Sequence, residues 1–163
     1  MAKILLGFMG AGKTTVAHHI SGQLLDMDTI IEERIGMPIA DFFAKEGEAA
    51  FRQIESEVLE ELLSLQGDVV ISTGGGVVIS PKNRDLLRQN RKYNVLLTAS
   101  FDVLYERILQ DKLSKRPLFL NNSKEDFQKI YQGRMDLYDG LADVIINTDN
   151  RTPEEIARLI QCM

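Results

Sequence analysis

The sequence predicts an α/β fold with three layers, in which a central five-stranded parallel sheet lies between helices. Two observations support this. Short apolar runs alternate with amphipathic stretches of helical period, the order typical of strand–helix–strand units. The first apolar run also leads directly into a glycine-rich loop and the start of a helix. The runs expected to be strands are 4–6, 24–28, 69–71, 94–98 and 143–147.

Glycine and proline mark the ends of most of the expected helices. Gly22, Gly36 and Gly47 each follow a helical stretch, where a glycine can adopt the left-handed conformation that ends a helix. Thr152 is a suitable N-cap because Pro153 follows it at the first helical position. The expected helices are 13–21, 29–35, 38–45, 48–65, 81–89, 101–110, 124–138 and 153–161.

Length and composition are those of an ordinary globular chain. With 163 residues, of which 44% are hydrophobic, residues 1–163 are expected to form a single domain. A net charge of −5 argues against a broad basic face for nucleic acid or a membrane surface. A single cysteine and a short apolar N-terminal run favour a cytoplasmic protein. A monomer is the default expectation.

The loop after the first strand has the pattern G-x-x-x-x-G-K-[ST], which is the phosphate-binding P-loop. Its glycines allow backbone N–H groups to curl around phosphate oxygens. Lys13 can then reach the β- and γ-phosphates, and the Thr14 hydroxyl can bind Mg²⁺. A glycine-rich turn beside a surface lysine is the alternative. The expected nucleotide contacts are Gly10, Ala11, Gly12, Lys13, Thr14 and Thr15.

Two carboxylates follow the second apolar run, at Asp26 and Asp28. If this segment is extended, both side chains point to the same face, since strand side chains alternate. Asp26 then suits the Mg²⁺ shell, and Asp28 can accept a hydroxyl proton. Solvated acids at the end of a strand are the alternative reading.

Two arginines are candidates for binding a substrate carboxylate. Arg52 lies three residues before Glu55, which can fix its rotamer, although an ion pair on a solvated helix face explains the spacing equally well. Arg134 invites the same two readings. Residues Gly74, Gly75 and Gly76 follow a buried strand and form either a flexible turn or a bare backbone against which a substrate can lie.

A basic stretch interrupted by Pro117 suggests a lid over residues 110–122, with Arg116 as the cation that closes onto the nucleotide. A solvated loop is the alternative. Arg151 is a further candidate for a contact with the nucleotide base, although its neighbours are explained by helix capping alone.

Taken in order along the chain, these motifs resemble the shikimate kinases. The matching segments are G-x-G-K-T-T at 10–15, D-x-D at 26–28, F-R-x-x-E at 51–55, S-x-G-G-G at 72–76, R-P-L at 116–118 and R-x-x-x-Y at 134–138. The resemblance implies a fold like that of nucleoside monophosphate kinases and transfer of the γ-phosphate of MgATP to the 3-hydroxyl of shikimate.

The resemblance also assigns residues to the two substrates. Asp28, Arg52, Gly75 and Arg134 match family residues that hold shikimate, and Arg116 and Arg151 match residues that touch ATP. The stretch from Lys13 to Asp26 looks about four residues shorter than is usual in the family, so the first helix or the second strand must be trimmed.

Three other functions share some of these features. Another small-molecule kinase, for example one acting on gluconate, would share the P-loop without needing both arginines. A GTPase-like switch is disfavoured because the sequence has neither an N-K-x-D nor a D-x-x-G motif. An inactive nucleotide-binding module would not need the full set of Lys13, Thr14, Asp26 and Asp28.

Overall fold

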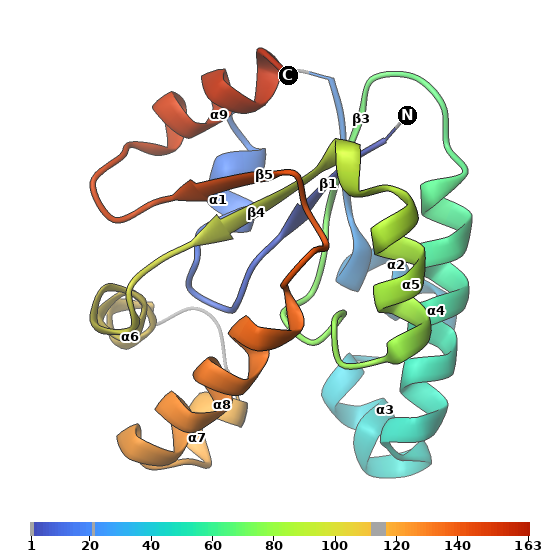
Figure 1. Cartoon of the computed structure of the whole chain (residues 1–163). Coiled ribbons are helices and arrows are strands. Elements are labelled where there is room, and N and C mark those ends of the chain that lie inside the picture. Colours follow the sequence, from blue (N-terminus) through green and yellow to red (C-terminus); the bar gives the residue numbers. More distant parts are fainter. Residues whose placement is uncertain (1, 21, 112–116) are drawn as a thin grey trace.

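Five parallel strands form one sheet in a computed structural model that describes residues 2–20, 22–111 and 117–163 (Figure 1). The strand order is β2-β3-β1-β4-β5, so β1 is central. In the register, Leu5 pairs with Ser72 on one side and with Val95 on the other. The strands are β1 (Lys3–Leu6), β2 (Gln23–Asp26), β3 (Val69–Ser72), β4 (Asn94–Thr98) and β5 (Val144–Asn147). The predicted five-stranded parallel sheet is confirmed.

Alternating side chains of the strands bury two faces under different helices. Leu5 points into a cluster with α1 (Lys13–Ala17) and α9 (Pro153–Gln161). Ile4 and Leu6 point into a larger cluster on the opposite face. That face is covered by α2 (Met27–Ile35), α3 (Ile39–Glu46), α4 (Glu48–Leu63) and α5 (Pro81–Gln89), with a 3₁₀ turn (Arg91–Tyr93) before β4.

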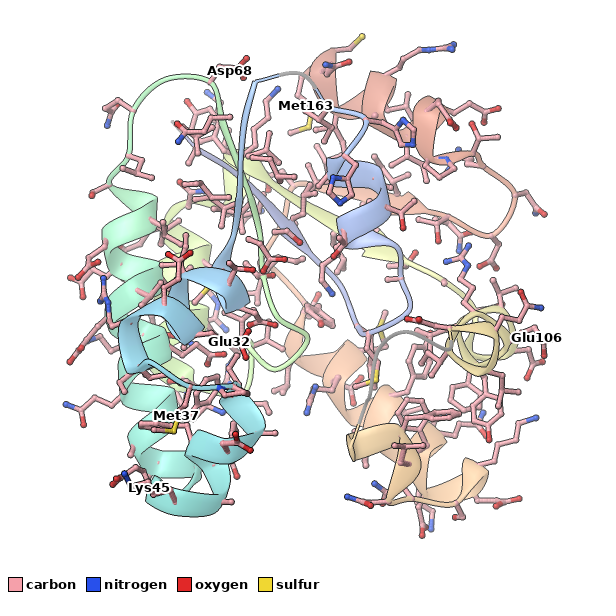
Figure 2. The ribbon with its side chains drawn as sticks, turned by 180° about the vertical axis from the view of Figure 1, so that it is seen from behind. Glu32, Met37, Lys45, Asp68, Glu106 and Met163 are labelled. Carbon is pink, nitrogen blue, oxygen red and sulfur yellow. The ribbon has the colours of Figure 1, made fainter. Side chains whose placement is uncertain are left out.

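A third apolar cluster lies beyond the carboxyl ends of β1 and β4. Phe8 of the P-loop packs edge-on against Phe127, with ring centroids 5.5 Å apart. The cluster joins the P-loop to α6 (Phe101–Gln110) and α8 (Lys124–Leu137), and the short α7 (Pro117–Leu120) precedes α8. Figure 1 shows α3 and α8 on opposite sides below the sheet, and Figure 2 shows Asp68 and Met163 at the far end of the molecule.

The first helix is shorter than predicted. It ends at Ala17 rather than at residue 21, which accounts for the shortened stretch before Asp26. Gly22 does not cap this helix. It has a φ of +110°, and a Cβ at Gly22 would lie 2.8 Å from Asp68 Oδ2, so the glycine allows β2 to begin close to β3.

The expectation that the second strand continues to Asp28 is wrong. The strand β2 ends at Asp26, whose Oδ1 accepts hydrogen bonds from Asp28 N at 3.0 Å and from Thr29 N at 3.4 Å. Asp26 is thus the N-cap of α2. Its capping hydrogen bonds start the helix directly after Asp26, so the chain does not stay extended as far as Asp28. Asp28 lies in the first helical turn, so the two carboxylates do not share a strand face. The other expected helices and strands either have the predicted bounds or differ by at most two residues at an end.

No helix in the described parts of the chain combines the length and apolar character that crossing a membrane requires.

Candidate active site

A cleft of about 1110 Å³ opens beyond the carboxyl ends of the strands, the edge at which parallel α/β sheets bind ligands. Its walls come from the P-loop, α2, α3, α4, the loop after β3, α6 and α8. The volume exceeds that of an ordinary single-ligand pocket. Of the predicted site residues, those that line the cleft are Gly10, Gly12, Lys13, Thr14, Thr15, Asp28, Arg52, Gly74, Gly75, Gly76 and Arg134.

Three predicted site residues that the structure describes are not part of this lining. Ala11 is buried in the cluster beneath α1 and α9, and Asp26 caps α2. The Arg151 side chain is exposed, and its Nη1 donates to Asn147 O at 2.9 Å. Arg116 and the neighbouring residues 112–115 of the predicted lid lie outside the described residues.

The P-loop bends sharply between β1 and α1. Gly12 has a φ of +99°, a conformation that favours glycine. A Cβ at Gly7 would lie 2.7 Å from the backbone oxygen of Leu97, so no side chain fits there. Lys13 is only 8% exposed, and its ammonium donates to the carbonyl oxygens of Gly7 and Phe8. The lysine charge is therefore held inside the loop, where an anion entering the cleft meets it.

Asp28 faces the cleft from the first turn of α2. Burial raises the pKa of its carboxyl, and the nearby Asp26 carboxylate raises it further, while the Lys13 ammonium opposes both effects. A Cβ at Gly74 would lie 2.8 Å from Asp28 Oδ1, so the glycine leaves room for this carboxylate. A carboxyl group with a raised pKa beside a phosphate-binding loop is a suitable proton acceptor.

Arg52 crosses the cleft wall from α4 to the loop after β3. Its Nη1 donates to Glu55 Oε1 at 3.0 Å and to Gly76 O at 3.0 Å, and its guanidinium lies 5.1 Å from the ring centroid of Phe51. The side chains of Arg52 and Glu55 are 18% and 3% exposed. The alternative of an ion pair on a solvated face is therefore wrong.

Arg134 enters the same cleft from α8. Its Nη1 donates to Gly75 O at 2.9 Å, and its guanidinium lies 5.7 Å from the ring centroid of Phe8. Burial lowers the pKa of Arg134, and the charge of Arg52 lowers it further. Two partly buried guanidinium groups are thus held by adjacent carbonyls of the glycine loop, an arrangement suited to binding a carboxylate.

Arg107 is a cleft residue that the sequence analysis missed. Its Nη1 donates to Gly10 O at 3.1 Å and to Thr148 Oγ1 at 3.0 Å, and its Nη2 donates to Thr148 O at 3.1 Å. The arginine of α6 thereby ties the P-loop to the segment after β5. Its partners lie 97 and 41 residues away, so no local motif identifies it.

A magnesium site would have few protein ligands here. The described ranges contain no group of three or more His, Cys, Asp or Glu side chains that could hold a metal ion. Mg²⁺ beside a nucleotide usually takes most of its ligands from phosphate and water, with one or two from the protein. The Thr14 hydroxyl, in the first turn of α1 at the cleft wall, fits that requirement.

Comparisons with known proteins agree with this geometry. The family model described as shikimate kinase matches residues 9–163. The shikimate kinase of Streptococcus thermophilus is 64% identical over 163 residues, which are 100% of both chains, and that of Streptococcus suis is 60% identical over 162 residues, which are 99% of each. The solved structure of the shikimate kinase from Acinetobacter baumannii in complex with shikimate matches with a TM-score of 0.85 and 34% identity, covering 98% of this chain and 90% of that one.

Proposed function

The chain belongs to the shikimate kinase family, and we propose which of its residues perform the reaction of that family. The protein is an ATP-dependent phosphotransferase that phosphorylates a hydroxyl group of shikimate. Phosphoryl transfer depends mainly on positioning and on stabilising the charge of the transferred group. The residue roles below follow from these two requirements.

On the donor side, the P-loop holds the phosphates of ATP. Backbone N–H groups of Gly10 to Thr15 would surround the phosphate oxygens. The Lys13 ammonium, which donates to carbonyl oxygens of the loop, would reach the β- and γ-phosphates. Thr14 would hold Mg²⁺, with Asp26 acting through a water molecule, and the bound ion would supply positive charge that neutralises the phosphates. Arg116 and Arg151 remain predicted ATP contacts.

On the acceptor side, Arg52 and Arg134 bind the carboxylate of shikimate. Asp28 accepts a hydrogen bond from the hydroxyl that is phosphorylated, which we take to be the 3-hydroxyl, and receives its proton. The three glycines at 74–76 keep the loop backbone close to the substrate. A single observation supports this assignment: both guanidinium groups are held by the glycine loop, in the cleft that also contains Asp28 and Lys13.

A coupled ADP-release assay tests the acceptor. MgATP is supplied with shikimate, quinate, gluconate or no acceptor. We expect rapid ADP release with shikimate, because its carboxylate can meet the two arginines while a hydroxyl group meets Asp28. Comparable release with gluconate would contradict the assignment, whereas release without any acceptor would indicate a simple ATPase.

Replacing Arg134 by alanine should raise the KM for shikimate about 10–100-fold, the effect of losing one charged hydrogen-bond donor to a carboxylate. The KM for ATP should change by less than about threefold, because the substitution weakens binding of the acceptor and leaves the donor site intact. Arg88→Ala is the control, because the Arg88 side chain forms an exposed pair with Asp85 on α5 and does not line the cleft. Unchanged acceptor kinetics in Arg134→Ala would refute the carboxylate role.

Replacing Gly76 by alanine should raise the same KM by roughly tenfold, because the new Cβ would lie 2.9 Å from both Nη1 and Nη2 of Arg52 and displace its guanidinium. The guanidinium is the flexible end of a long side chain, so the fold should tolerate the methyl group. Gly133→Ala is the matched control, since a Cβ there meets nothing within 4 Å. Steady-state kinetics and the Tm are measured for both variants, and equal KM values would contradict the prediction.

Three broader expectations stay proposals. We take residues 1–163 as one domain, because strands from Lys3 to Asn147 build a single sheet, with residues 29–65 forming the acceptor wall. A monomeric state and a cytoplasmic location remain predictions.

A further inference from the structure

A buried polar cluster lies behind the acceptor wall, and it meets the lining of the cleft at Glu55. Its centre is Asn83, in the first turn of α5, which is 0% exposed. Two neighbours from α4, Ser56 and Glu55, are 5% and 2% exposed. Buried polar side chains lower stability unless their hydrogen bonds are satisfied, so this cluster requires an explanation.

The hydrogen bonds of Asn83 fix the orientation of its amide. Its Oδ1 accepts from Ser56 Oγ at 2.6 Å, while its Nδ2 donates to Glu55 Oε1 at 3.2 Å and to Val77 O at 3.0 Å. Neither a carboxylate nor a backbone carbonyl can donate a hydrogen bond, so the nitrogen must face these two oxygens. Both amide hydrogens are therefore used.

The two oxygens to which Asn83 donates lie on or directly beside the groups that hold Arg52. Glu55 Oε1 and Oε2 lie 3.0 Å and 3.1 Å from Arg52 Nη1. Val77 directly follows Gly76, whose carbonyl oxygen accepts from the same Nη1 at 3.0 Å. One amide thus connects the carboxylate on α4 with the glycine loop, and Arg52 lies between the two.

The Asn83 hydrogen bond also favours the charged form of Glu55. Burial raises the pKa of the Glu55 carboxyl, whereas the charge and hydrogen bonds of Arg52 and the hydrogen bond from Asn83 lower it. Without Asn83, the buried carboxylate would have one fewer donor and a weaker hold on the arginine.

We propose that Asn83 is a positioning residue for acceptor binding. Its two hydrogen bonds fix the position of the Arg52 guanidinium, one through Glu55 and the other through the loop backbone at Gly76 and Val77. The inference rests on the proposed role of Arg52 in binding the carboxylate of shikimate. Asn83 itself touches no substrate.

A double-mutant cycle with Arg52 tests the proposal. Asn83→Val should raise the KM for shikimate about tenfold, with the KM for ATP changed by less than about twofold, since loss of a buried charged hydrogen bond has roughly this effect. In the Arg52→Ala background, Asn83→Val should change the KM for shikimate by less than about twofold, because the group it positions is gone. Equal effects in both backgrounds would overturn the proposal.

Ser56→Ala is the matched control. It removes the hydrogen bond that Ser56 Oγ donates to Asn83 Oδ1 and leaves the amide nitrogen that binds Glu55 unchanged. Ser56→Ala should therefore lower the Tm without changing the KM for shikimate. If Asn83→Val does not fold, Asn83→Ser replaces it with the same expectation. Failure of both to fold would overturn the proposal, because the residue would then serve the fold as a whole.

The two proposals fail in different ways. An unchanged KM for shikimate in Arg52→Ala alone would refute the carboxylate role in the proposed function. A raised KM in Arg52→Ala with an unchanged KM in folded Asn83→Val would refute only the role of Asn83.

Discussion

Replacing Lys13 by alanine is expected to lower kcat by about 10³-fold or more, one of the two largest effects expected for a single substitution in the cleft. Lys13 lies within the P-loop and is 8% exposed, so its charge acts in a site largely shielded from water. The γ-phosphoryl group gains negative charge on its peripheral oxygens during transfer, and the lysine stabilises that charge. The measurement is kcat at saturating ATP and shikimate.

The structural role of Lys13 must be separated from its catalytic one. Its ammonium also donates to Gly7 O and Phe8 O, so its loss removes contacts that shape the loop. Lys13→Met keeps most of the aliphatic stem without the charge and should lose as much activity as Lys13→Ala. Thermal unfolding shows whether each variant is folded. A folded Lys13→Met enzyme within about tenfold of the parent kcat would contradict the role in transition-state stabilisation.

The P-loop could be predicted from the sequence because all its parts are contiguous. A strand, three glycines, a lysine and a threonine specify one local backbone, and the structure places them as expected. The same is true of the five strands, whose apolar runs are bounded by clear breaks. Local chemistry also explains why the second strand does not reach Asp28, because Asp26 has a residue type that caps a helix as readily as it ends a strand.

Residues that act through tertiary contacts could not be predicted in this way. Arg107 looks like an ordinary basic residue near a helix end until the fold brings Gly10 and Thr148 beside it. Asn83 lies 28 residues from Glu55 in sequence, and their hydrogen bond depends on how α5 packs against α4. Glycines 74–76 were predicted to lie against a ligand, yet Gly74 and Gly76 are also needed because Asp28 and Arg52 occupy the adjacent space.

Replacing Asp28 by asparagine is expected to lower kcat by about 10²–10⁴-fold while leaving ATP affinity unchanged, the effect of losing a general base. The asparagine has nearly the same shape, so the fit against Gly74 is preserved and only the charge and the proton acceptor are lost. The measurements are kcat with shikimate and the Kd for ATP.

The matched control is Glu32→Gln, which makes the same chemical change one turn further along α2. Glu32 also lines the cleft, and its Oε2 accepts from Ile39 N at the start of α3 (Figure 2). We expect Glu32→Gln to change kcat by less than about threefold, since its carboxylate serves a helix end rather than the acceptor. Equal losses in the two variants would indicate a general effect of negative charge in the cleft.

The pH dependence separates the role of Asp28 as a base from a purely positioning one. Because burial raises the pKa of Asp28, its active charged form is lost at a higher pH than for an exposed aspartate, and kcat/KM should fall as the pH drops through that raised value. In Asp28→Asn, this acidic decline should disappear. An unchanged decline in the variant would assign it to another group.

Stability should respond to the pH in the opposite sense. A carboxyl whose pKa is raised in the folded state binds its proton more tightly there than in the unfolded chain. Its contribution to the free energy of unfolding is therefore most favourable below the unfolded pKa and is lost as the pH rises through the raised pKa. Asp28→Asn removes a buried charge at neutral pH. Without bound substrates, the variant should therefore have a Tm at least as high as that of the parent. A large loss of kcat together with an unchanged or higher Tm would mean that the cleft keeps a destabilising carboxylate because the reaction requires it.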